Sequence, residues 1–273
     1  MAKADKSTAG VVEEAKKRFE YAKQAYSATR LLAVEDTRFA MGDSDNGYQW
    51  PEDIRNTRKL DKRVCLTVNM TAQHCNQIIN NIRQNRPAVK VSPADDGADK
   101  ETANILGGLI RNIQASSAAD DAHDCAAEHS VYGGEGYWRV VTEYESDTSF
   151  NQVIKVKACP NPQLVYIDPD CKELDKSDAQ WGFVFEDITK EQFEREHPDI
   201  SPASWADEAR KNGWETDTTF RRAEYFYCTY EKATACLGDD GQTYLKDKIP
   251  FGVNVIKERP TEIKKRRWCR VVG

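Results

Sequence analysis

The sequence predicts an α+β fold in which long N-terminal helices are followed by a β-rich region of hairpins and short helices. Up to about residue 131, apolar residues recur at steps of three and four, which is the period of an amphipathic helix. Beyond a glycine cluster at 133–136, apolar and polar residues alternate, as in half-buried strands. The 273 residues are enough for one large or two modest domains with a buried core.

Composition limits the functional classes. Only 39% of the residues are apolar, 31% are charged, and the formal net charge is -6, so no global basic field indicates nucleic-acid binding. No apolar run could cross a bilayer, and a polar stretch rather than a secretory signal follows Met1. The eight cysteines lack C-x2-C and C-x4-C spacing, so we expect reduced, small, buried side chains and no metal or cofactor.

The N-terminal part reads as helices. Residues 1–10 are small and polar and are expected to be disordered, and residues 11–132 form the predicted helical region. A narrow apolar stripe over 12–33 predicts the first helix. A second helix is predicted over 69–85, followed by a short strand over 88–91 between two prolines.

A third, long helix is predicted from about residue 97 to residue 131. It contains Gly107 and Gly108, each of which costs roughly 1 kcal/mol relative to alanine in a helix interior. That cost is tolerable if another backbone packs closely against the two glycines.

The glycine cluster marks the change from helix to strand. Gly133, Gly134 and Gly136 are too closely spaced for a dinucleotide-binding fingerprint, and no Gly-Lys-Ser/Thr follows as in a phosphate-binding loop. A helix C-cap with a tight turn into a strand at Trp138 and Arg139 is favoured, because it requires a backbone conformation that glycine adopts cheaply. These five residues are therefore interpreted as a structural hinge.

Residues 133–273 form the predicted β-rich region. Alternating segments at 137–144 and 150–157 predict a β-hairpin. Thr189 and Gln192 form a capping box that begins a short helix, and Ser201-Pro202 begins another. Further strands are predicted at 165–167, 181–185, 220–231 and 263–272.

Clustered carboxylates suggest one catalytic alternative. Two-metal nucleases use such groups to hold Mg²⁺ against a phosphate, and Asp168, Asp170 and Asp178 would serve here. Glu173 and Asp175 lie between them, with lysines interleaved, so a solvated turn with side-chain-to-backbone hydrogen bonds is favoured. We expect no catalytic residues, and the nuclease remains the alternative.

The dense basic run within 257–270 is the second candidate. It could contact phosphates, and Trp268 could stack on a base, which would make a small DNA-binding module. More often, such a run is the solvated face of a strand or binds an acidic neighbour, so that interpretation is favoured. The residues concerned are Lys264, Lys265, Arg266, Arg267 and Arg270.

Several segments carry a family resemblance. They are, in order, 84–87 with a proline-terminated stretch to 93, then 134–144, 151–154, 175–179, 223–225 and 263–267. Together they resemble the portal proteins of short-tailed, double-stranded DNA phages of the P22 type. The resemblance runs from about residue 69 to the last residue, and residues 1–68 match only in helical character.

This resemblance implies a structural protein that is not an enzyme. Such portals form a dodecameric ring at one capsid vertex of the virion and conduct DNA during packaging and ejection. The implied partners are other copies of the chain, the terminase large subunit, capsid and scaffolding proteins, tail or adaptor proteins and double-stranded DNA, with no membrane. Assembly would take place in the host cytoplasm.

The resemblance also assigns a part of the portal. Residues 133–273 would be a truncated wing region, because family chains are far longer, and the stem, clip and crown or barrel would be largely absent. No DNA-contacting motif of the family transfers residue by residue.

Overall fold

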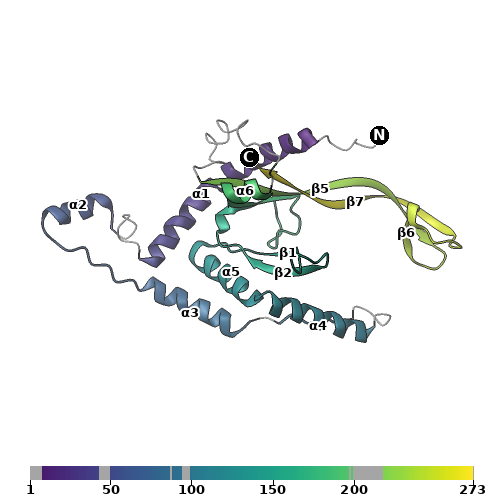
Figure 1. The fold of residues 1–273 in the computed structure, drawn as a ribbon, viewed down its shortest axis with the longest axis horizontal. Helices are drawn as coiled ribbons and strands as arrows, with labels where there is room; N and C mark the ends of the chain where they lie inside the picture. The colour runs from purple at the N-terminus through teal and green to yellow at the C-terminus, as the bar shows by residue number, and fades with distance from the viewer. Residues whose placement is uncertain are drawn as a thin grey trace. The chain divides into compact units, whose positions relative to one another are not determined.

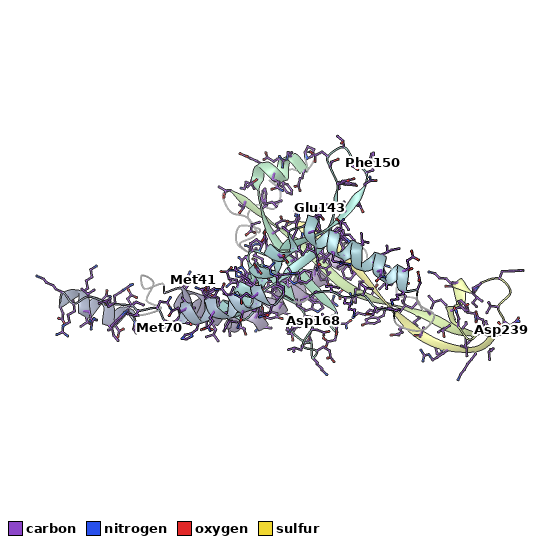
Figure 2. All side chains as sticks on the ribbon, turned by 90° about the horizontal axis from the view of Figure 1, so that it is seen from below. Met41, Met70, Glu143, Phe150, Asp168 and Asp239 are labelled. Atoms are coloured by element: carbon purple, nitrogen blue, oxygen red, sulfur yellow. The ribbon has the colours of Figure 1, made fainter. Side chains whose placement is uncertain are left out.

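A computed structural model describes residues 8–42, 50–86, 88–93, 99–196, 198 and 218–272 (Figures 1 and 2). The α+β prediction is confirmed. In chain order the elements are α1 (Thr8–Met41), α2 (Glu52–Leu60), α3 (Thr71–Gln84), α4 (Lys100–Ser116), α5 (Ala119–Gly133), β1 (Trp138–Tyr144), β2 (Gln152–Ala158), a 3₁₀ turn (Pro162–Leu164), β3 (Val165–Ile167), β4 (Trp181–Thr189), α6 (Lys190–Glu196), β5 (Thr219–Gly238), β6 (Thr243–Leu245), a 3₁₀ turn (Lys246–Lys248) and β7 (Val255–Val272).

The chain divides into two compact units. Met1–Tyr26 and Leu164–Gly273 form the first, and Ser27–Gln163 form the second, so α1 contributes to both. The first strand follows helix α5, which ends at Gly133. The boundaries between the two compact units lie at other places, after Tyr26 and after Gln163. Among the described residues, no helix is both long and apolar enough to span a membrane.

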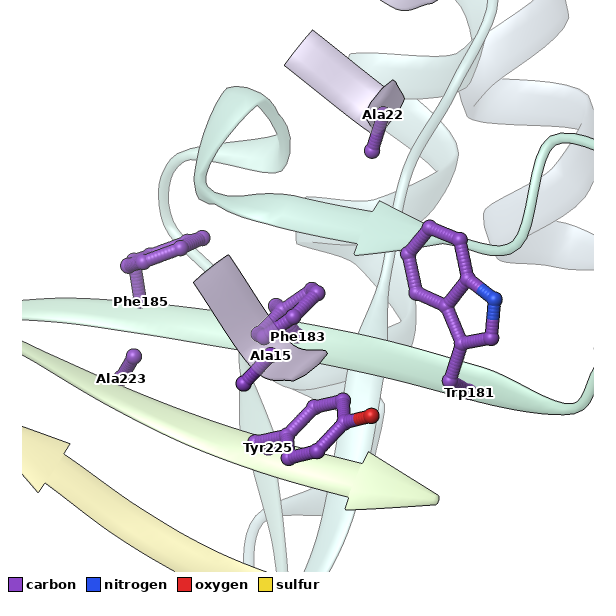
Figure 3. Close-up of a cluster of buried hydrophobic side chains, with 7 residues drawn as sticks. All are labelled: Ala15, Ala22, Trp181, Phe183, Phe185, Ala223 and Tyr225. Carbon is purple, nitrogen blue, oxygen red and sulfur yellow. The ribbon is translucent and has the colours of Figure 1, made fainter. Parts of the chain in front are cut away.

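The first unit is built on a five-stranded antiparallel sheet of order β3-β4-β5-β6, with β7 also paired to β5. Phe183 on β4 lies opposite Tyr225 on β5, and their stacked ring centroids are 4.7 Å apart. Because strand side chains alternate between faces, every second residue joins one apolar face, which the start of α1 covers through Phe19. The buried members of this cluster are Ala15, Ala22, Trp181, Phe183, Phe185, Ala223 and Tyr225 (Figure 3).

Tyr225 gives this core a defined response to alkaline pH. Burial raises the pKa of Tyr225 to about 12, against the opposing effect of Arg18, whose guanidinium donates to the tyrosine hydroxyl over 2.5 Å. A raised pKa stabilises the fold below the unfolded value of about 10, and that stability is lost as pH rises through the folded value. We expect urea unfolding to show a loss of about 2 kcal/mol between pH 10 and 12.

Tyr225→Phe is the control for this pH effect, because phenylalanine keeps the ring and removes the ionisable group. Its unfolding free energy should fall less between pH 10 and 12 than that of the unaltered chain. Parallel curves for the two proteins would contradict the assignment to Tyr225.

The opposite face of the sheet is covered at one end by the short helix α6. Phe193 of α6 packs with Ile188 and Phe220. Arg222, only 9% exposed, pairs with Glu186 at 2.8 Å and with Glu196 of α6 at 2.9 Å. Half of the predicted capping box is present, since the Gln192 backbone amide donates to the hydroxyl of Thr189 just before the helix. The Gln192 side chain donates to Glu196 of the same helix.

The second unit places a two-stranded hairpin against helices. β1 and β2 pair antiparallel over their full length, which confirms the predicted hairpin. Val156 of β2 packs against Ala119 and Ala122 of α5. Helix α3 joins the same unit through ion pairs, among them one of 3.2 Å between Arg83 and Asp124 of α5.

Several sequence predictions for the helical part were wrong. The long helix over 97–131 is two helices, because Ala118 adopts a left-handed conformation with φ of 48°. The Lys155 ammonium group caps the first of them by donating to the Ser116 carbonyl over 2.8 Å. Residues 88–91 form no strand. No atom lies within 4 Å of a Cβ built on Gly107 or Gly108, so no backbone packs there among the described residues.

Some element boundaries also differ. Helix α1 extends beyond the predicted 12–33 at both ends and includes residues 8–10, while residues 1–7 lie outside the described part. Helix α2 was not predicted, since none of its residues is buried and it has no apolar stripe. The helix predicted at 201–202 also lies outside the described residues. All eight cysteines are free thiols, but only Cys159 and Cys236 are buried.

Candidate functional site

The glycine hinge begins with a helix C-cap. Helix α5 ends at Gly133, and Gly134 follows with φ of 85°, in the left-handed region. The Gly134 amide donates to the carbonyl of Ser130 over 3.0 Å. This satisfies a carbonyl that the end of the helix leaves unpaired, in a conformation that glycine adopts at least cost.

Gly136 serves a different purpose, because the chain passes very close to α5 there. A Cβ at this position would lie 1.8 Å from the carbonyl oxygen of Ala126 and 2.8 Å from the hydroxyl of Ser130. At Gly133 the nearest atom would be the hydroxyl of Thr37 at 3.2 Å. The glycines therefore let the backbone reverse tightly against its own helix, which is a structural task.

Trp138 and Arg139 begin the hairpin beyond the glycines. The Trp138 ring meets the ring of His123 on α5 edge-on, with centroids 4.9 Å apart, and remains 47% exposed. Arg139 lies opposite Lys157 in the sheet register. The ring contact thus connects α5 to the hairpin, and the backbone pairing closes the hairpin itself.

The carboxylate cluster forms a hydrogen-bonded turn in the first unit. Asp168, labelled in Figure 2, is only 5% exposed, and its carboxylate accepts from the amides of Asp170 and Gln180, both at 3.2 Å. Asp178 accepts from the amide of Lys172 at 2.7 Å. Hydrogen bonds from backbone amides lower the pKa of Asp178 and, through the Ser177 amide, the pKa of Asp175.

One further contact of this turn was not predicted from the sequence. The Tyr21 hydroxyl on α1 donates to Asp170 over 2.9 Å, from 149 residues away. Within the described part of the chain, no three His, Cys, Asp or Glu side chains come together in a group that could hold a metal. The geometry fits the interpretation as a solvated turn, in which the carboxylates accept hydrogen bonds from backbone amides of their own loop.

The basic run lies on β7, where carboxylates of β5 face it. Glu231 pairs with both Lys265 and Arg267, and the hydrogen bond from Lys265 lowers the pKa of Glu231. Arg270 pairs with Glu224 at 3.1 Å, and the Lys264 ammonium donates to the Ala179 carbonyl over 3.4 Å. The antiparallel register therefore offsets part of the positive charge that appears concentrated in the sequence.

One face of this strand pair combines aromatic and basic groups. Arg266, Trp268 and Arg270 alternate with the residues that face Glu231 and the core, so they lie on the opposite face. Trp268 is 59% exposed there, and the Arg270 guanidinium lies 5.6 Å from the centre of its ring. Phe226, paired with Trp268, is 42% exposed. A DNA or subunit contact at this face remains a prediction.

Comparison with known proteins identifies the class. The chain matches the family described as phage P22-like portal protein over residues 16–273. It is 30% identical over 193 residues to a portal protein of Acyrthosiphon pisum secondary endosymbiont phage 1, an alignment that covers 68% of this chain and 26% of that protein.

These matches define the class as phage portal proteins. The chain belongs to the P22-like portal protein family, as its sequence motifs predicted. It spans about a quarter of the length of the curated relative it matches.

Proposed function

We propose that the chain is a structural, non-enzymatic subunit of a portal ring at one capsid vertex of a phage virion. The ring conducts double-stranded DNA during packaging and ejection and joins head to tail. The family match over residues 16–273 carries this proposal. Residues 133–273 belong to the wing region of such a subunit.

Exposed apolar surface supports an assembled state. On α4, Ile105 and Leu109 are 65% and 51% exposed and lie on one helix face with Gly108, one turn apart. Large apolar side chains rarely form an exposed patch on a monomer, and in oligomers such patches become buried between subunits. A heterologous contact repeated by rotation closes such subunits into a ring.

The proposed partners follow from the place of a portal ring at a capsid vertex. They are other copies of the chain in a dodecamer, the terminase large subunit, capsid and scaffolding proteins, and tail or adaptor proteins. DNA would pass through the channel, and assembly would precede packaging in the host cytoplasm.

Particle images test the proposal directly. Negative-stain microscopy of the purified full-length subunit should show closed rings of one rotational symmetry, and mass measurement should give one multiple of the subunit mass. A protein that stays monomeric at micromolar concentration in both measurements would overturn the portal assignment.

The two alternatives predict other results. A carboxylate-metal nuclease would cleave DNA with Mg²⁺ or Mn²⁺ and lose that activity in Asp168→Ala. A DNA-binding module would show affinity that falls steeply with salt and is lost when Arg266 and Arg267 are replaced by alanine. The hydrogen bonds of Asp168 and the ion pair of Arg267 with Glu231 favour structural roles for both groups.

A further inference from the structure

Residues 64–69 lie between α2 and α3 and form neither helix nor turn (Figure 1). Their apolar side chains are exposed to solvent. Val64, Leu66 and Val68 are 72%, 74% and 76% exposed, whereas the three residues between and after them are only partly exposed. This strict period of two is that of a strand with one apolar face. In this segment the apolar face is exposed to solvent.

The backbone in the middle of this segment has no backbone partner within the described residues. Cys65, Leu66, Thr67 and Val68 make no backbone–backbone hydrogen bond with any described residue. The segment is nevertheless held at both ends. The Val64 carbonyl accepts from Arg58 at 2.9 Å, and the Asn69 amide group donates to the Ala40 carbonyl over 2.8 Å. An anchored segment with open donors and acceptors is ready to pair with the edge of a sheet.

The same unit offers an edge of matching length and chemistry. Strand β1 has seven residues and pairs only with β2 in its two-stranded sheet, so its other edge carries no described strand. Val140 and Tyr144 lie on one face of β1 and are 59% and 61% exposed. Val140 is β-branched and Tyr144 is aromatic, and residues of both kinds form stabilising cross-strand pairs.

An antiparallel register brings the two apolar faces together. With Val64 opposite Tyr144, Leu66 lies opposite Thr142 and Val68 opposite Val140. The same register sets Arg63 opposite Glu145, so opposite charges meet where the apolar face ends. A slip by one residue would turn the apolar side chains to the other face, so the register is specified.

We propose that residues 64–69 of one subunit add as a third strand to the free edge of β1 in a second copy of the chain. This inference rests on the proposed ring, because donor and acceptor are different surfaces of one subunit and their contact repeats around a rotation axis. Main-chain hydrogen bonds give the contact its strength, and the alternating apolar side chains fix its register.

Disulfide trapping in the full-length subunit tests the register. Leu66→Cys combined with Thr142→Cys places two thiols directly opposite, where antiparallel Cα atoms lie about 4.5–5.5 Å apart, within the range of a disulfide. Oxidation should give a ladder of covalent multimers on a denaturing gel. Leu66→Cys with Val141→Cys is the control, since position 141 faces the other side and should give no ladder beyond that of the single variants and the native cysteines.

Charge substitution tests the contribution to assembly. Leu66→Lys with Val68→Lys should reduce the fraction of subunits in rings at least tenfold, with an unchanged circular dichroism spectrum. Leu174→Lys, at a residue 99% exposed in the first unit, is the matched control and should assemble normally.

The outcomes separate this inference from the proposed function. Absence of rings in the unaltered protein would overturn the portal proposal itself. Rings formed normally by the double lysine variant, without a cysteine ladder, would overturn the strand addition and leave the ring standing. A crosslink confined to single chains would show that the segment pairs within its own subunit, which also overturns the proposal.

Discussion

Replacing Gly136 with alanine is expected to destabilise the unit formed by Ser27–Gln163 by about 3 kcal/mol or more. The added Cβ would lie 1.8 Å from the Ala126 carbonyl oxygen, a backbone atom in the middle of α5. A flexible side chain could move aside, but this carbonyl is fixed by the helix, so either the helix or the turn into β1 must shift. Urea unfolding and the soluble yield of the variant measure the effect.

Two other glycines serve as matched controls for this substitution. Gly134 has open space around it but a φ of 85°, so alanine there should cost only about 1–2 kcal/mol of backbone strain. Gly108 lies inside α4, and no described atom outside the backbone of its own helix lies within 4 Å of a Cβ built there, so Gly108→Ala should stabilise by about 1 kcal/mol. Equal effects at positions 134 and 136 would show that the chain does not approach α5 as closely as the structure has it.

These glycines also show what the sequence alone could predict. Their spacing excluded known phosphate-binding patterns and indicated a C-cap with a tight turn, because only glycine reaches such conformations cheaply. The sequence could not tell that Gly134 is needed for its φ and Gly136 for the space beside Ala126. That difference depends on where the chain returns in three dimensions.

Elements with a strong internal period were predictable, and elements defined by distant contacts were not. The hairpin of β1 and β2 follows from apolar alternation. The break at Ala118 does not, since alanine favours helices and the capping Lys155 lies far along the chain. Likewise the basic run on β7 appears as free charge until the register places Glu231 and Glu224 beside it.

The exposed segment 64–69 has a sequence pattern that is compatible with a strand. Valine, leucine and valine at alternate positions are typical of a strand, yet the segment is short and lies in a part of the chain read as helical. The period of two predicts which side chains share one face of a strand, but it does not predict whether that face is buried or exposed. Only the structure shows that this face points to solvent and that the backbone lacks a described partner.

The second large effect is expected from Phe183→Ala in the core of the first unit. Phe183 is 3% exposed, stacks on Tyr225 with centroids 4.7 Å apart, and meets Phe19 of α1 at 5.9 Å. Truncating a fully buried phenylalanine removes its transfer free energy and leaves a cavity, which together cost about 3–5 kcal/mol. Urea unfolding should therefore shift to much lower denaturant concentration, with an unchanged slope.

Phe226→Ala is the control, because the two phenylalanines differ mainly in the face of the sheet they occupy. Phe226 lies one residue beyond Tyr225 on β5, on the opposite face, and is 42% exposed. Much of its surface already contacts water, so truncation should cost the free subunit less than about 1 kcal/mol. If Phe226→Ala proved as damaging as Phe183→Ala in the monomer, the face covered by α1 would not be the main core of this unit. If Phe226→Ala instead left the monomer stable and reduced ring formation, it would place the aromatic and basic face of β5 and β7 in a subunit contact.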